Sequence, residues 1–288
     1  MTEHVRAEAD ALVIRGVDDV GVAGVVVGAA TDVGRLRTIN EDGYLAISPA
    51  FVVVDGMGGH AAGRMATQVA LDSLYSLAGT TVTDVETVVR AVKTAQEAIV
   101  AIPSHAAYLP GATIAGVVLA WMEDEQGVTR PTWIIFNIGD ALVYLLRDNM
   151  LSQVTCDHSR VQILIETGEL TPEQARRDPR RNIVTRALGG GIADSGVPDL
   201  YTVPVAAGDR FLICSDGLSD ELDDEAIATV LAAGCTAQRT AELLVAASLE
   251  GGGHDNTTAV VVDSLQVPTP PLGARAFHPG DASSQGAQ

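Results

Sequence analysis

The sequence is poor in aromatic residues and in cysteine. Aromatic side chains make up only 4% of the 288 residues, whereas hydrophobic residues make up 47%, so a large core has to form from Val, Leu, Ile and Ala. The three cysteines, Cys156, Cys214 and Cys235, form no Cys-x-x-Cys pair. They therefore argue against a disulfide framework and suit a reducing cytoplasm.

Basic residues and long apolar runs are also scarce. The chain has 18 Lys and Arg against 37 Asp and Glu, which gives a net charge of −19. Nucleic acids and anionic membranes bind to basic faces, so we expect neither as a partner. No apolar run reaches the roughly 18 residues of a membrane helix, and acidic residues within the first ten positions argue against a signal peptide. We expect a cytoplasmic protein that acts as a monomer.

Composition divides the chain into three parts. Residues 1–20 are acidic and weakly patterned, which indicates an N-terminal leader or an extra edge strand. Residues 21–265 form one domain, and residues 266–288, rich in Pro, Gly, Ser and Ala, form a disordered tail. Within the domain, the stretch from about 157 to 182 is polar and is interrupted by Pro172 and Pro179, as is typical of a small insertion.

Apolar patterning predicts an α+β fold. Helical spacing of apolar residues predicts helices at 63–77, 84–102, 223–232 and 236–249. Short apolar runs predict strands at 21–28, 44–47, 51–54, 112–121, 131–138, 142–146, 151–154, 199–203, 210–214 and 257–262. Strands and helices do not alternate regularly, so we expect a four-layer αββα sandwich, with two antiparallel sheets flanked by helix pairs.

Three predicted strands end on an aspartate next to a glycine. The run Phe51–Val54 leads into Asp55-Gly56, the run 211–214 leads through Ser215 into Asp216-Gly217, and the run 133–138 leads into Gly139-Asp140. An unpaired buried carboxylate is costly. Several such strand ends in one chain therefore suggest carboxylates gathered around a hard cation.

The acidic residues beside predicted strands predict a divalent metal site. The candidate ligands are Asp42, Asp55, Asp140, Asp216 and Asp255. Oxygen ligands alone select Mg²⁺, Mn²⁺ or Ca²⁺ over zinc or copper. Two such ions about 3.5–4 Å apart can acidify a water and balance the charge of an oxyanion such as phosphate.

The alternative is that each aspartate belongs to a turn and that the acidity is a solvated surface. The chain has no P-loop and no Gly-x-Ser-x-Gly motif.

Six motifs in order resemble one known family. They are Arg37-Thr-Ile-Asn-Glu-Asp42, Asp55-Gly-Met-Gly-Gly-His60-Ala-Ala-Gly63, Asn137-Ile-Gly-Asp140, Asp157-His-Ser159, Ser215-Asp-Gly-Leu218 and Asp255-Asn-Thr-Thr258. Together they resemble the metal-dependent protein phosphatases, the type 2C-like family, over about residues 21–263. The resemblance implies hydrolysis of phosphoserine and phosphothreonine by a hydroxide that bridges two Mg²⁺ or Mn²⁺ ions, without a covalent phosphoenzyme.

The resemblance also implies a role for each metal ligand. Asp55 would bridge both ions, with the Gly56 carbonyl as a further ligand, and Asp216 and Asp255 would hold one ion. Asp42, with Glu41 nearby, would orient waters on the pair. Asp140, together with Asp216, would hold a third ion that bacterial members bind.

Outside the metal ligands, the resemblance implies a phosphate clamp and a flap. Arg37 would clamp the phosphate with its forked donors, the alternative being a surface arginine, for which Arg35 is the control. Residues 157–185 match the family's variable flap, which influences substrate choice.

The chain departs from the family pattern in three places. Met57 stands where animal and plant members carry the histidine assigned as general acid, as is usual in bacterial members. His60 is the nearest substitute and either acts as that acid or only packs or binds water. The family's Gly-Thr-Thr is Gly111-Ala-Thr113 here, and its Gly-Asp-Ser-Arg is Gly139-Asp-Ala-Leu142, which removes a polar pair beside Asp140.

The leading hypothesis is therefore a bacterial protein serine/threonine phosphatase. Its expected partners are phosphorylated proteins, including a serine/threonine kinase. Two alternatives remain open. One is a non-catalytic phosphoprotein-binding regulator that keeps the fold, and the other is a hydrolase of small phosphoesters, because a two-metal site alone does not choose the substrate.

Overall fold

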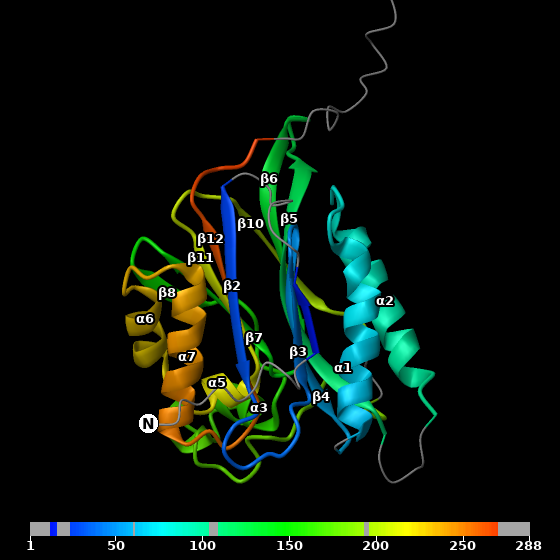
Figure 1. The fold of residues 1–288 in the computed structure, drawn as a ribbon, viewed down its shortest axis with the longest axis vertical. Helices are drawn as coiled ribbons and strands as arrows, with labels where there is room; N and C mark the ends of the chain where they lie inside the picture. The colour runs from blue at the N-terminus through cyan, green and yellow to red at the C-terminus, as the bar shows by residue number, and fades with distance from the viewer. Residues whose placement is uncertain (1–11, 16–23, 60, 104–108, 193–195, 270–288) are drawn as a thin grey trace, which may run out of the picture.

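The computed structural model describes residues 12–15, 24–59, 61–103, 109–192 and 196–269. Within these ranges the chain forms four layers, with two β-sheets packed face to face between two pairs of helices (Figure 1). The predicted α+β sandwich is confirmed. The predicted tail beyond residue 269 and most of the predicted leader lie outside the described residues.

The layers are built from short elements. The strands are β1 (Leu12–Arg15), β2 (Val25–Asp32), β3 (Asp42–Ile47), β4 (Ala50–Met57), β5 (Gly111–Glu123), β6 (Thr129–Ile138), β7 (Leu142–Arg147), β8 (Met150–Gln153), β9 (Leu188–Gly189), β10 (Asp199–Pro204), β11 (Arg210–Cys214) and β12 (Thr257–Ser264). The helices are α1 (Ala61–Leu74), the 3₁₀ turn Tyr75–Leu77, α2 (Val85–Val100), α3 (Arg160–Glu166), α4 (Pro172–Ala175), α5 (Asp216–Ser219), α6 (Asp224–Leu231) and α7 (Ala237–Gly251).

Both sheets are almost wholly antiparallel. The first has the order β1-β3-β4-β5-β6-β10, with β9 paired to β5, and the second has the order β2-β12-β11-β7-β8. The exception is β1, which lies within the predicted leader and pairs with β3 in parallel as an edge strand. Each sheet therefore has one face against a helix pair and one face against the other sheet.

Apolar side chains fill all three interfaces between the layers. Successive residues of β4 point to opposite faces of the sheet, so Val52 and Val54 pack under α1 and α2 while Phe51 and Val53 pack between the sheets. A third cluster lies between the second sheet and the helices α6 and α7. Because β4 is buried on both faces, its sequence is a continuous apolar run rather than an alternating one.

Local signals set several helix ends. Asp84 caps the start of α2, where its side chain accepts a hydrogen bond from the Thr87 backbone N–H at 2.7 Å. Thr171 and Gln174 form a capping box at the start of α4. Among the described residues, no helix combines the length and apolar character needed to cross a bilayer.

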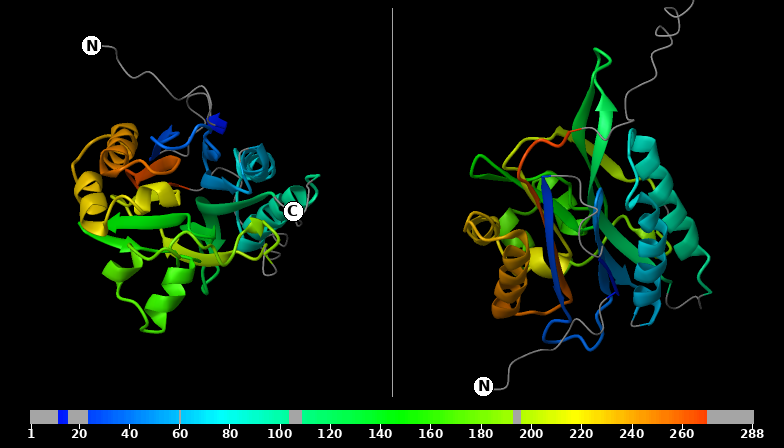
Figure 2. Two further views of the ribbon diagram at one scale, coloured as in Figure 1. Left: turned by 90° about the horizontal axis from the view of Figure 1, so that it is seen from below. Right: turned by 45° about the horizontal axis from the view of Figure 1, so that its top comes forward.

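The strand ends that carry the predicted ligands meet at one end of the sandwich, the lower end in Figure 1. β4, β6 and β11 finish there, while β3 and β12 begin there. The pairing of β3 with β4 sets Asp42 directly opposite Asp55. Figure 2 (left) looks onto this end, where α3 and α4 project to one side. The topology alone thus collects residues that are more than two hundred positions apart in the sequence.

Candidate active site

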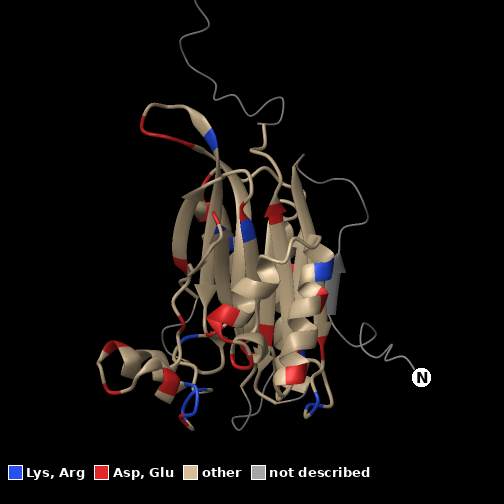
Figure 3. Ribbon diagram, turned by 90° about the vertical axis from the view of Figure 1, so that its left-hand side faces the viewer, with Lys and Arg blue, Asp and Glu red and all other residues tan. Residues whose placement is uncertain are grey.

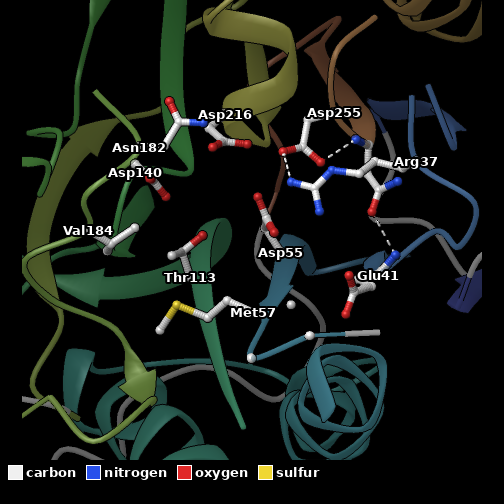
Figure 4. Close-up of a pocket in the computed structure, with 14 residues that line it drawn as sticks. Arg37, Glu41, Asp55, Met57, Thr113, Asp140, Asn182, Val184, Asp216 and Asp255 are labelled. Carbon is white, nitrogen blue, oxygen red and sulfur yellow. Dashed lines mark hydrogen bonds and ion pairs between the residues drawn. The ribbon is translucent and has the colours of Figure 1, made fainter. Parts of the chain in front are cut away.

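A cavity of about 310 Å³ opens at this end of the sandwich. Its lining includes Arg37, Glu41, Asp55, Gly56, Met57, Asp140, Asp216 and Asp255. Figure 4 shows the carboxylates of Asp55, Asp140, Asp216 and Asp255 around one space, with the guanidinium of Arg37 at its rim. The structure therefore brings most of the predicted site residues together.

Close packing against α1 fixes the end of β4. A Cβ added to Gly56 would lie 2.4 Å from the Gly63 carbonyl oxygen and 2.5 Å from the Thr67 hydroxyl, so only glycine fits between β4 and α1. The same Thr67 hydroxyl donates to the Glu41 carbonyl oxygen at 2.6 Å. One turn of α1 therefore positions both Glu41 and the Asp55-Gly56 peptide at the cavity.

Asp42 faces the second sheet rather than the cavity. Its Oδ2 accepts hydrogen bonds from the hydroxyls of Ser215 at 2.8 Å and Thr258 at 2.7 Å. Its Oδ1 is buried without a hydrogen-bond partner. Burial raises the pKa of Asp42 to about 7 although both hydroxyls act to lower it. Asp42 is not among the residues that line the cavity, whereas its neighbour Glu41 is.

Burial and neighbouring negative charges raise the pKa values of two carboxyl groups inside the cavity, Asp55 and Asp216. Burial raises the pKa of Asp55 well above its usual value, and the charges of Asp42, Asp216 and Asp140 raise it further. Burial and the charges of Asp140, Asp220 and Asp255 do the same for Asp216. A divalent cation placed among these carboxylates would offset their mutual repulsion.

A histidine fixes the loop that presents Asp140. Gly139, at φ +105°, donates its N–H to the Nδ1 of His158 at 3.0 Å and accepts the His158 N–H at 3.0 Å. The Nε2 of the buried His158 lies 3.2 Å from Asp199. Burial, and next the charge of Arg186, lower the pKa of His158, which keeps the ring neutral. Burial and the charge of Asp157 raise the pKa of Asp140 to about 7.

An asparagine fixes the loop that carries Arg37. The buried amide of Asn256 donates to the carbonyl oxygens of Val33 at 2.9 Å and Ile39 at 3.0 Å, and it accepts the Glu41 N–H at 2.8 Å. At the rim of the cavity, Arg37 donates to Asp255 at 2.6 Å. Neither Asn256 nor His158 has a predicted role, although they are members of the motifs Asp255-Asn-Thr-Thr258 and Asp157-His-Ser159.

The remaining predicted positions differ in how far they bear on the cavity. His60 lies outside the described residues. Met57 lines the cavity, and Arg35 is exposed and does not. Ala141 and Leu142, which depart from the family pattern, are buried and pack into two apolar clusters. That departure therefore adds to the core and leaves the lining of the cavity unchanged.

The donor set fits hard divalent cations. Five carboxyl groups but only one guanidinium are among the lining residues, so the ionised site would carry a large excess of negative charge. All the side-chain donors are oxygens, which Mg²⁺ and Mn²⁺ prefer. In the described ranges, no three acidic, histidine or cysteine side chains yet converge at metal-binding spacing.

Comparison with known proteins gives concordant matches. The family model for protein phosphatase 2C matches residues 38–251. The serine/threonine protein phosphatase PstP of Mycobacterium tuberculosis is 37% identical over 240 residues, which are 82% of this chain and 44% of that protein. The serine/threonine phosphatase stp of Listeria monocytogenes is 35% identical over 245 residues, 81% of this chain and 93% of that protein.

A solved structure extends the likeness to three dimensions. The catalytic domain of PstP in complex with two manganese ions superposes with a TM-score of 0.73 at 34% identity, over 83% of this chain and 97% of that domain. The chain thus spans less than half of the length of the mycobacterial relative and nearly all of the Listeria one.

Proposed function

The chain belongs to the protein phosphatase 2C family, and we propose that it hydrolyses phosphoserine and phosphothreonine in proteins. The observation that carries this proposal is the cavity that sets Asp55, Asp140, Asp216 and Asp255 beside one arginine. Carboxylates suit divalent cations, and a guanidinium at the rim suits a phosphoryl group. The names of the relatives support a protein substrate.

The metal ligands follow from the donor set and from the family. Asp55 and the Gly56 carbonyl, with Asp216 and Asp255, would hold two Mn²⁺ or Mg²⁺ ions, and Asp140 with Asp216 would hold a third. Asp42, opposite Asp55 on the neighbouring strand, would support the ion pair from behind Asp55, and Glu41 lines the cavity. Divalent ions held there supply the chemistry of two-metal hydrolases, because they lower the pKa of an attacking water and offset phosphoryl charge.

The chain's own groups bind and orient the phosphate. A guanidinium has five donors, and only one of those of Arg37 is committed to Asp255. The others are available to two phosphoryl oxygens, which a planar fork binds in one fixed orientation. Asn256 keeps the backbone on both sides of Arg37 in place, so the fork stays at the rim. His60 stays our candidate for the proton donor to the leaving oxygen.

Partners and location follow from the same proposal. The substrates are phosphorylated proteins, and a serine/threonine kinase that phosphorylates itself is the first to test. We propose a cytoplasmic setting, supported by the three free thiols Cys156, Cys214 and Cys235. We also propose a monomer, which the elution volume in gel filtration tests.

Turnover of para-nitrophenyl phosphate and of a phosphothreonine peptide in Mn²⁺ tests the activity. We expect turnover that a chelator abolishes and that Asp55→Asn lowers by at least about a hundredfold, because even supporting residues of metal sites cost that much. Asp72→Asn is the matched control, since Asp72 is exposed on α1. Wild-type rates in Asp55→Asn would refute the site.

The two alternative functions are separated by the same assay. A non-catalytic regulator predicts no turnover of either substrate, and the departure that favoured it, Ala141-Leu142, lies in the core. A small-phosphoester hydrolase predicts faster turnover of phosphorylated metabolites than of phosphopeptides. No observation on the cavity favours either alternative.

A further inference from the structure

A second cavity, of about 360 Å³, adjoins the first. Its lining residues are Arg37, Arg176, Arg181, Asn182, Gly217, Asp220, Glu221, His254 and Asp255. Arg37, Asn182 and Asp255 line both cavities. A peptide that places its phosphate in the first cavity can therefore extend into the second one.

The flap, residues 157–185, supplies two of the three arginines in this lining. The flap has five arginines and five acidic residues, so it is neutral within a chain of net charge −19. Four of the five arginines lie within residues 176–181. Much of the Lys and Arg in Figure 3 lies at the lower end of the molecule, where the flap is. Four guanidinium groups are thus concentrated in a short part of the flap, beside the second cavity.

Arg176 and Arg181 are only loosely held. Arg176 donates to the carbonyl oxygens of Ser219 at 3.5 Å and Leu222 at 3.3 Å. Arg181 lies 3.4 Å from Asp220, and both side chains are about 40% exposed. A well-formed bond between a guanidinium and a carboxylate is about 2.7–2.9 Å long, so an incoming anion competes against weak contacts.

The acidic residues of the second cavity are already paired. Glu221 accepts from the backbone N–H of His254 at 3.2 Å and lies 2.6 Å from its Nδ1. Asp255 is paired with Arg37, and Asp220 with Arg181. The hydrogen bonds described for Arg176 go only to carbonyl oxygens, and its charge acts on Asp220 without a direct ion pair.

We propose that the second cavity is a subsite for an anionic side chain close to the phosphorylated residue of the substrate. This inference rests on the proposed function. The ligand is an oxyanion, either the carboxylate of Asp or Glu or a second phosphoryl group, bound by the guanidinium forks of Arg176 and Arg181. An extended peptide advances about 3.3–3.6 Å per residue, so a side chain within three positions can reach a neighbouring cavity.

Matched phosphopeptides test the subsite. Each peptide carries one phosphothreonine. One further position, within three residues of the phosphothreonine on either side, is varied. That position holds alanine, lysine, glutamate or a non-hydrolysable phosphonate analogue of phosphoserine. We expect one or two positions at which an anion lowers KM about tenfold relative to alanine while kcat changes little. The glutamate and phosphonate arms distinguish the two sources of the anion.

Variants of the flap assign the effect to the two arginines. In Arg176→Ala/Arg181→Ala the ratio of kcat/KM between the anionic and alanine peptides falls below about twofold. Arg181→Glu shifts the preference towards the lysine peptide, which a purely structural role would not do. Arg177→Ala is the matched control, because Arg177 is exposed on the same flap and does not line the cavity, so it keeps the preference. Thermal denaturation of each variant checks that it is folded.

The outcomes separate this inference from the activity. Equal KM values for all peptides in an active wild-type enzyme would overturn the subsite, as would a preference that survives in the double variant. No turnover of any peptide or of para-nitrophenyl phosphate in Mn²⁺ would refute the proposed function instead. In that case, fluorescence anisotropy of the same peptides still decides the subsite, which fails if the glutamate and alanine peptides bind equally.

Discussion

Arg37 stands between two anions, the carboxylate of Asp255 and the phosphate that it is proposed to bind. Its side chain is half exposed, and its contact with Asp255 is 2.6 Å. Arg35, two residues earlier, is exposed as well, but its described contact to Gly253 is made by its backbone N–H. The two arginines therefore lie on the same loop and carry the same charge, but only Arg37 lines the cavity.

We expect Arg37→Ala to lower kcat/KM by about tenfold to a hundredfold, mainly through a higher KM, since it removes a charge-assisted contact to substrate. Initial rates on a phosphothreonine peptide over a range of concentrations give both constants. Arg35→Ala should stay within about twofold of wild type. Similar losses in both variants would mean that the loop contributes only general positive charge.

Single-residue patterns predicted the carboxylates of the site but not the residues that hold them in place. Asp55, Asp140 and Asp216 follow apolar runs, which is a signal within about ten residues of sequence. Asn256 and His158 act on backbone groups of distant segments, such as the Glu41 N–H, 215 positions from Asn256. No local pattern specifies such a bond, because it exists only once the strands have paired.

At the level of elements, the flap and the strand end before Asp140 are joined through His158. The histidine precedes α3, and its backbone and ring hold both the N–H and the carbonyl of Gly139 after β6. The two elements are therefore mechanically coupled at the point where Asp140 enters the cavity. A substitution of His158 should therefore change both the free energy of unfolding and the affinity for metal.

We expect His158→Ala to lower the free energy of unfolding by about 1–3 kcal/mol, because it leaves the buried Gly139 N–H without an acceptor. The Mn²⁺ concentration for half-maximal activity should rise as Asp140 becomes less fixed. Thermal denaturation and metal titration measure the two effects. His158→Asn keeps an acceptor near the position of Nδ1 and should recover part of both; an alanine variant with unchanged metal titration would contradict the coupling.

Most strands and the long helices were predictable because their apolar period extends over several turns or pleats. The missed elements are short. α3 has seven residues, with Val161 and Leu164 buried, and α5 has four. β9 has two residues and depends on β5 for its pairing. Tertiary contacts rather than local propensity decide such elements.

The whole molecule should respond to pH through its buried carboxyl groups. Asp42 and Asp140 have pKa values of about 7 in the folded chain, against 3.8 for an ordinary aspartate. Between pH 3.8 and about pH 7, the folded state keeps these protons, whereas the unfolded state has released them. The stability they contribute is therefore complete below the unfolded value and is lost as pH rises towards 7, by up to about 1.4 kcal/mol per pH unit and group.

We expect the melting temperature in a chelator to fall between about pH 5.5 and about pH 7.5. Added Mn²⁺ should raise it more at the higher pH, because the metal and the protons compete for the same oxygens. Differential scanning calorimetry measures both effects. Asp42→Asn, which cannot ionise, should flatten the profile, and an equally steep profile in that variant would count against this explanation.

The last described strand, β12, ends at the pole opposite the cavity, whereas the first, β1, begins beside Gly43 at the cavity end. Val25 at the start of β2 pairs with Ser264 at the end of β12, and the Leu265 N–H donates to the Gly24 carbonyl at 2.7 Å. The eight residues of β12 separate this pole from Thr257 by roughly 24 Å. A fusion partner, tether or solid support joined there acts as a handle, and it leaves the mouth of the cavity open to large protein substrates.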